Sequence, residues 1–127
     1  MKIETNKASG FILNYLVMVA EGHNYEIVDG AILTGRTVWR DFLAYDEEYS
    51  PSTNRDQGYE IFDRERIGFK YTGTAMGFVA WLNGELSTKY DHYGKDPLEA
   101  GLRVYVHKKL GEEVDVPDEL IQLGETV

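Results

Sequence analysis

Two stretches of the chain carry apolar residues at the spacing of one helical face. The first covers residues 9–21, where Ser9 precedes the pattern as an N-cap and a glycine ends it. The second covers residues 96–110, where Asp96 is the cap, Pro97 occupies the first turn and lysines lie in the last turn. The apolar positions that set the spacing are Ile12, Leu16, Val19 and Ala20 in the first stretch and Leu98, Leu102, Tyr105, Val106 and Leu110 in the second. We therefore predict two amphipathic helices.

Shorter apolar runs with turn residues between them predict strands. Residues 25–28 and 31–33 flank Asp29-Gly30, a dipeptide that supplies the positive φ angles of a two-residue hairpin turn. The stretch 36–48 holds aromatic and apolar residues whose spacing fits neither a clean strand nor a clean helix, so both remain open. Three further strands are predicted over residues 59–62, 67–71 and 76–82.

The remaining segments are polar and predict loops and short turns. Residues 50–58 indicate a loop followed by a short helical turn, and residues 83–95 indicate a long loop or a hairpin extension. In the tail, we expect Val114 and Val116 to lie against the body and residues 117–123 to add a final turn. The predicted fold is α+β, with a small antiparallel sheet that carries the helices 9–21 and 96–110 on one face. A length of 127 residues suits a single domain over 1–127.

Composition and charge narrow the classes of function. The chain has no cysteine, which excludes disulfides, thiolate nucleophiles and metal sites with cysteine ligands. Its 22 acidic and 13 basic residues give a net charge of −9, and such a field repels phosphate backbones and anionic membranes. The run at residues 10–20 is too short to span a bilayer, and it lacks the pattern of a secretion signal because Asn14 interrupts it. We therefore expect a cytoplasmic protein without a direct nucleic-acid or membrane partner.

Candidate catalytic groups are few. His23, His92 and His107 are far apart along the chain and show no metal-ligand spacing. Acidic pairs such as Glu47-Glu48 have polar flanks, which favours solvated surface over a buried acid–base pair. We predict no catalytic residue, no metal site and no cofactor.

The stretch at residues 49–55 is the strongest candidate for a binding site. Its hydroxyls, an amide and an arginine lie beside a predicted helix N-terminus, where backbone N–H groups attract anions. The helix that begins at Pro97 supplies a second such terminus, and nearby aromatic side chains would stack on a base. The predicted ligand-binding residues are Tyr49, Ser50, Ser52, Thr53, Asn54, Arg55, Trp81 and Arg103. In the alternative interpretation, the hydroxyls cap the backbone, the arginines pair with the surplus acids and the aromatic residues fill the core.

Several of these segments together resemble a known family. They are Tyr49-Ser50-Pro51-Ser52-Thr53-Asn54, the strand residues Ile61 and Ile67, Ala80-Trp81, the run from Asp96 to Arg103, and the tail over residues 111–120. In these features the chain is similar to the NinX family of phage and prophage proteins. It departs from the family at Arg55, where members often have an aromatic residue, and at Leu102, where they often have Met. The resemblance implies a phage accessory gene that is expressed inside a bacterium, and it implies no catalytic chemistry.

The resemblance and the candidate loop together predict a non-catalytic binding protein. We expect it to sequester a small anionic ligand such as a nucleotide signal of host defence. The second hypothesis is an acidic interaction protein that blocks a host protein, including one that binds nucleic acid. An enzyme that degrades a nucleotide comes third, because no nucleophile or metal motif is found. A homo-oligomer is expected, since clefts between subunits readily enclose a small ligand.

Overall fold

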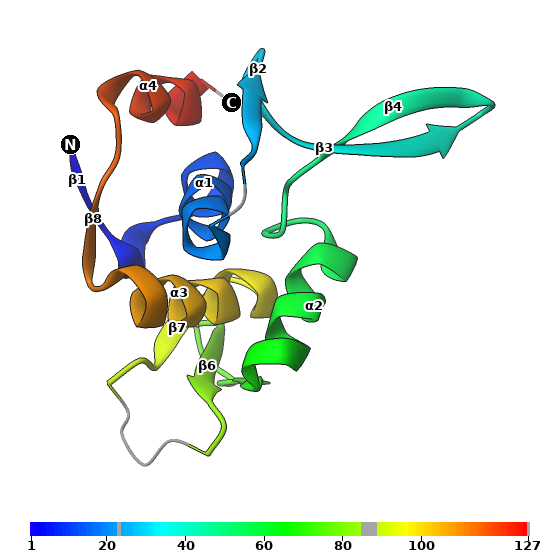
Figure 1. Cartoon of the computed structure of the whole chain (residues 1–127). Helices are drawn as coiled ribbons and strands as arrows, with labels where there is room; N and C mark the ends of the chain where they lie inside the picture. Colours follow the sequence, from blue (N-terminus) through cyan, green and yellow to red (C-terminus); the bar gives the residue numbers. More distant parts are fainter. Residues whose placement is uncertain (23, 85–88, 127) are drawn as a thin grey trace.

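The computed structural model describes residues 1–22, 24–84 and 89–126 (Figure 1). Its elements in chain order are β1 (Lys2–Glu4), η1 (Thr5–Lys7), α1 (Gly10–Glu21), β2 (Glu26–Val28), β3 (Ala31–Arg40), β4 (Leu43–Glu48), α2 (Arg55–Glu65), β5 (Ile67–Tyr71), β6 (Phe78–Leu82), β7 (His92–Gly94), α3 (Pro97–Leu110), β8 (Glu113–Asp115) and α4 (Asp118–Thr126). The strands form three small antiparallel sheets, β1–β8, β2–β3–β4 and β5–β6–β7. The α+β class expected from the sequence is confirmed.

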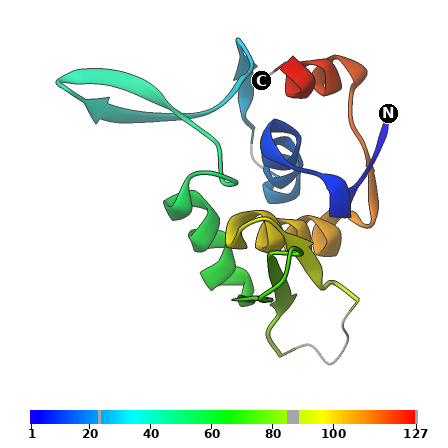
Figure 2. The ribbon, with the colours of Figure 1, turned by 180° about the vertical axis from the view of Figure 1, so that it is seen from behind.

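Helix α3 lies at the centre of the molecule, between α1 and the sheet β5–β6–β7 (Figures 1 and 2). Its residues Ala100, Leu102, Val104 and Val106 are each 0% exposed. A helix that is covered on several sides has to be apolar around most of its circumference, and this explains the run of small and branched residues. Helix α2 packs against α3, and α4 packs on α1. Both predicted helices are therefore confirmed, and α3 is the one that covers the sheet.

Two glycines allow neighbouring elements to approach α3 closely. A Cβ atom at Gly101 would lie 2.5 and 2.7 Å from the ring carbons Cε1 and Cε2 of Phe62 on α2. A Cβ atom at Gly94 on β7 would lie 2.5 Å from the backbone nitrogen of Ala100. Both distances are far below van der Waals contact, so any larger residue would push α2 or β7 away from the central helix.

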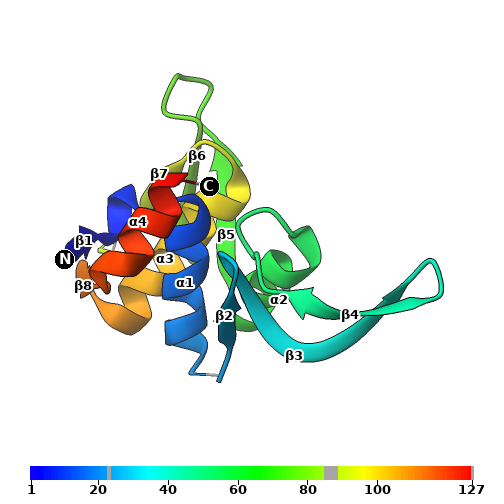
Figure 3. The same ribbon diagram turned by 90° about the horizontal axis from the view of Figure 1, so that it is seen from above.

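The strands β3 and β4 extend from the body as a two-stranded arm, defined here as residues 36–48 (Figures 1 and 3). The predicted turn at Asp29-Gly30 is confirmed, with φ angles of 50° and 79°. Beyond β2, β3 pairs only with β4, and the chain reverses at Asp41 and Phe42 with φ angles of 49° and 66°. The stretch left open between strand and helix is thus strand, turn and strand. Its pattern is unclear because solvent reaches both faces of the arm, so neither face is consistently apolar.

The strand predicted over residues 59–62 is wrong, because this segment belongs to helix α2. The side chain of Asn54 accepts a hydrogen bond from the backbone N–H of Gln57 at 3.2 Å and so caps the helix. Buried positions at Gln57, Gly58, Ile61 and Phe62 follow helical spacing. The segment 59–62 resembled a strand because three of its four residues are aromatic or aliphatic, and it is too short to show the helical period by itself.

The helical turn predicted within residues 50–58 is the beginning of the longer helix α2, and the other predicted segments agree with the structure. Strands β5 and β6 correspond to the runs 67–71 and 76–82, and β7 forms part of the segment 83–95, of which residues 85–88 lie outside the described residues. In the tail, Val116 is 1% exposed and α4 provides the final helix. None of the helices within the described part of the chain has the length and apolar character needed to cross a membrane.

Candidate functional site

The loop at residues 49–54, which joins β4 to α2, is held firmly against the body. The backbone N–H of Ser50 donates to Oε1 of Gln57 at 2.7 Å, and that of Ser52 donates to Oδ1 of Asn14 at 2.9 Å. Two backbone hydrogen bonds onto the carbonyl of Ser50 close the turn before α2. The loop therefore places its side chains at fixed positions beside the start of the helix.

This loop borders a cavity of about 510 Å³, named here the two-helix cavity because α2 and α3 both begin at it. Its lining comes from the loop, from the first turns of the two helices and from β6: Ser52, Thr53, Arg55, Tyr59, Phe78, Asp96, Pro97 and Leu98. The first N–H groups of a helix have no intrahelical partner, and they form the positive end of the helix dipole. Two such ends at one cavity favour an anionic group.

The charged and polar groups of the two-helix cavity differ in whether they already form hydrogen bonds within the protein. Arg55 is exposed at its rim. Asp96 is the opposing charge, but its Oδ1 accepts the N–H of Glu99 at 2.8 Å and so serves as the cap of α3. Oγ of Ser52 is buried without a hydrogen-bond partner among the described residues, which is costly for a hydroxyl unless a further group satisfies it.

An aromatic wall forms one side of the two-helix cavity. Tyr59 and Phe78 line it and belong to a larger cluster with Phe62, Phe69 and Tyr71. The rings of Tyr59 and Phe69 are stacked with centroids 6.0 Å apart, and those of Tyr71 and Phe78 lie 5.3 Å apart. A planar base would find a stacking surface here.

Three of the eight predicted ligand residues, Ser52, Thr53 and Arg55, meet at this cavity. The sequence pointed to both helix starts, but it gave no role to Phe78. Tyr59 belongs to the segment for which the sequence predicted a strand. It lies four residues after Arg55, and this spacing puts both on the same face once residues 55–65 are recognised as a helix.

The other five predicted residues lie elsewhere. Ser50 and Asn54 line a separate depression of about 430 Å³ beside the arm. The indole N–H of Trp81 on β6 donates to Oδ1 of Asn83 at 2.8 Å. The guanidinium of Arg103 donates to the carbonyls of Ala8 and Tyr93 at 2.8 Å each and forms an ion pair with Glu99 at 3.4 Å. These contacts match the alternative interpretation, in which such groups hold the fold together.

Tyr49 lines a third depression, of about 350 Å³, between α1, α2 and the arm. Its ring stacks on Tyr25 with centroids 4.7 Å apart, and burial raises the pKa of its phenol. Two arginines and three glutamates also line this depression: Arg36, Arg64, Glu21, Glu47 and Glu60. Because Arg36 pairs with Glu47 at 3.6 Å and Arg64 with Glu21 at 2.7 Å, neither arginine offers an unpaired charge to an anion.

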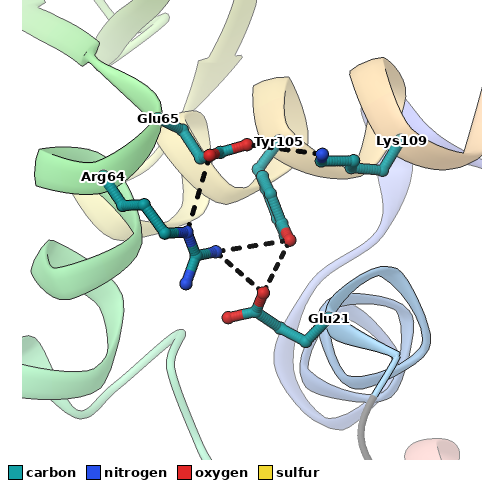
Figure 4. Close-up of polar contacts among 5 residues, drawn as sticks. All are labelled: Glu21, Arg64, Glu65, Tyr105 and Lys109. Carbon is teal, nitrogen blue, oxygen red and sulfur yellow. Dashed lines mark hydrogen bonds and ion pairs between the residues drawn. The ribbon is translucent and has the colours of Figure 1, made fainter.

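A polar network beside this depression connects the three central helices (Figure 4). Oε2 of Glu21, at the end of α1, accepts hydrogen bonds from Arg64 of α2 and from the phenol of Tyr105 of α3, both at 2.7 Å. Burial and this hydrogen bond raise the pKa of Tyr105, so the phenol keeps its proton as the donor. Glu65 extends the network to Arg64 at 3.5 Å and to Lys109 at 3.6 Å. The positive and negative charges of this network balance one another, which indicates that it holds α1, α2 and α3 together and does not bind a ligand.

The fold brings together two histidines that are far apart in the sequence. Nε2 of His92 on β7 lies 2.9 Å from Nδ1 of His107 on α3. Burial, reinforced by His107 and Arg103, lowers the pKa of His92 to about 4, and burial also lowers the pKa of His107. Spacing along the chain gave no sign of this pair because it depends on the contact between a strand and a helix. Within the part of the chain that the structure describes, no three ligand-type side chains are grouped to hold a metal ion.

Comparison with known proteins identifies a family for most of the chain. The family model described as "Bacteriophage P22, NinX" matches residues 5–109, which include the loop at 49–54 and nearly all of α3. No curated protein matches the chain. Because the family match covers most of the 127 residues, the chain belongs to the bacteriophage P22 NinX family of phage proteins.

Proposed function

We propose that this phage protein is a non-catalytic binding protein that sequesters a small anionic ligand in the two-helix cavity. The ligand is of the nucleotide class, and in the bacterial host it is a defence signal that the protein withholds from its receptor. The observation that carries the proposal is the convergence of two helix N-termini on one cavity with an aromatic wall.

The dimensions and chemistry of the cavity support this ligand class. About 510 Å³ lies within the range of roughly 300–1,000 Å³ that is typical of small-molecule sites. The phosphate would lie at the helix starts near Arg55, and the base would stack on Tyr59 or Phe78. Two of the segments that resemble the family, the loop at 49–54 and the start of α3, contribute residues to this cavity, although they lie more than 40 residues apart in the chain.

The residues that line the cavity support binding without turnover. Asp96 is the carboxylate among the lining residues, and its engagement with the N–H of Glu99 ties it to the start of α3. Ser52 and Thr53 supply hydroxyls, but neither has a histidine beside it among the residues that line the cavity in the described part of the chain. A nucleophile without an adjacent base is weak, so sequestration is the better supported activity.

The test is thermal unfolding of the purified protein against a panel of linear and cyclic nucleotides. A ligand at about 100 times its dissociation constant adds about 2.7 kcal/mol of apparent stability, which raises the midpoint by on the order of 10 °C. Arg55→Ala should weaken binding by at least about tenfold, because a hydrogen bond to a charged group contributes roughly 1.5–3 kcal/mol. Lys108→Ala is the matched control, since it removes one exposed cation from the other end of α3.

The outcome separates the three hypotheses. A shift with one nucleotide class that Arg55→Ala reduces by about half or more and Lys108→Ala preserves supports the proposal, provided that the ligand is recovered unchanged after denaturation. A chemically altered ligand would instead indicate an enzyme. No shift across the panel, or equal shifts in both variants, would refute the assignment of the two-helix cavity.

A further inference from the structure

The arm presents large apolar side chains that the body does not cover. Trp39 is 71% exposed, Phe42 98%, Leu43 58% and Tyr45 49%. Cross-strand pairing places Leu43 and Tyr45 on the same face of the ribbon, whereas Trp39 lies on the other face. Phe42 lies in the turn between β3 and β4, so exposed apolar side chains lie on both faces of the arm and at its tip.

The conformation of the tip is costly for the residues that form it. Asp41 and Phe42 both have positive φ angles, of 49° and 66°. Such turns favour asparagine and glycine, and a bulky side chain at positive φ is strained. Local stability therefore does not explain an aromatic residue at this position.

The strand edges of the arm are also uncovered. Within the described residues, β2 pairs only with residues 31–33 of β3, and no strand lies beyond β4. A two-stranded ribbon is marginally stable by itself in water, and open edges readily pair with other chains. An arm with exposed aromatic residues and open edges has the properties of an interaction surface, in which tryptophan, tyrosine and phenylalanine are enriched.

The charges around the apolar tip identify the kind of partner. Asp41, Asp46 and Glu48 are exposed on the arm, and Glu47 is already paired with Arg36. The arm has four acidic residues and two arginines, and the whole chain has a net charge of −9. A second copy of this chain would bring another −9 to the contact, and nucleic acid would bring more negative charge. A positively charged surface is complementary to the arm.

We propose that the arm docks on a host protein through an apolar pocket that is bordered by lysine and arginine side chains. Phe42 enters the pocket, Trp39 and Tyr45 cover its sides, and Asp41, Asp46 and Glu48 face the basic border. This contact is independent of the two-helix cavity and of any ligand in it. The homo-oligomer expected from the sequence is the competing occupant of the same surface.

The test places a photoreactive benzoylphenylalanine at residue 42 of the full chain in a lysate of the host bacterium. The same amino acid at residue 71 is the matched control, because Tyr71 is 63% exposed but lies on β5. Mass spectrometry of the adduct identifies the crosslinked peptide of the partner. An adduct that forms from residue 42 only, with a peptide in a Lys/Arg-bordered surface, supports the proposal. An adduct with a second copy of this chain, an adduct with an acidic surface, or no adduct at residue 42 overturns it.

Titration with the purified partner then measures the role of the ring. Phe42→Ser should weaken binding by at least about 30-fold, as for a central aromatic anchor, whereas Tyr71→Ser should change it by less than about twofold. Raising the salt from about 0.05 to 0.5 M should weaken binding about tenfold, because exposed charges are screened. Phe42→Ser should leave the thermal midpoint unchanged, since the ring is 98% exposed. Unchanged affinity in Phe42→Ser, or binding that is insensitive to salt, overturns the proposal.

Discussion

Replacing Gly101 by alanine should destabilise this protein, although the same exchange stabilises most helices. In an exposed helix interior, alanine is more favourable than glycine by about 1 kcal/mol. At Gly101 the new methyl group would lie 2.5 and 2.7 Å from two ring carbons of Phe62. The ring has little room to move, because Phe62 is 4% exposed and packs against Tyr59 and Phe69 with centroid distances of 5.4 and 6.0 Å.

The magnitude follows from the balance of these two effects. Overpacking of a core typically costs about 1–3 kcal/mol, occasionally more, and here one methyl group meets several ring atoms at once. After the gain in helix propensity, we expect Gly101→Ala to lower the free energy of unfolding by about 2 kcal/mol. With a urea dependence of about 1.5 kcal/mol/M, the unfolding midpoint would fall by about 1.3 M.

A double-mutant cycle assigns the effect to the contact between α2 and α3. Phe62→Leu shortens the side chain that the methyl group meets, so the double variant should lose about 1 kcal/mol less than the sum of the two single variants. Urea unfolding followed by circular dichroism measures all four proteins. A midpoint of Gly101→Ala equal to or above that of the wild type would refute the reasoning, and so would strict additivity.

Two further predictions concern the polar contacts of α3. Burial lowers the pKa of both histidines of the pair, that of His92 to about 4, whereas an unfolded histidine titrates near 6.5. The unfolded state therefore binds more protons than the folded state, so the free energy of unfolding should fall as pH decreases from about 6.5 to 4. His92→Gln should flatten this part of the stability profile. An unchanged slope in the variant would contradict the assignment of this pH dependence to the histidine pair. Tyr105→Phe removes the hydrogen bond to Glu21 but keeps the ion pair of Glu21 with Arg64. We expect the free energy of unfolding measured in urea to fall by about 1 kcal/mol. An unchanged free energy would show that this hydrogen bond adds nothing to stability.

Local signals in the sequence were sufficient for much of the fold. The cap at Asp96, the proline at the first turn of α3 and the turn at Asp29-Gly30 act within a few residues, so they can be recognised without tertiary context. Ser9 occupies the N-cap position of α1, although its side chain makes no capping hydrogen bond. Only the start of helix α2 was predicted, as a short turn within residues 50–58, because the evidence for the rest of the helix is tertiary. Gln57, a polar residue, occupies a buried position by bonding to Ser50 and to Glu47 on the arm.

The candidate site was only partly predictable for the same reason. The donors at the two helix starts are local features, and the sequence pointed to both. Their convergence depends on the packing of α2 on α3, in which a Cβ atom at Gly58 would lie 2.8 Å from the carbonyl oxygen of Pro51 and closer still to the side chain of Leu98. Arg103 was predicted to bind the ligand, but it bonds to the backbone of Ala8 and Tyr93. A sequence does not distinguish an arginine that is free to bind a ligand from one that holds the fold together.

The separation of the arm from the core affects how the protein can change over time. The side chains at its tip touch little of the body, so substitutions there alter what the arm contacts without altering what the core packs. The two-helix cavity has no such freedom, since Asp96 in its lining and Asn54 in the adjacent loop must cap helices whatever ligand is present. A phage could therefore redirect the arm to a new partner with a few point mutations, while the same number of changes in the cavity would first cost stability.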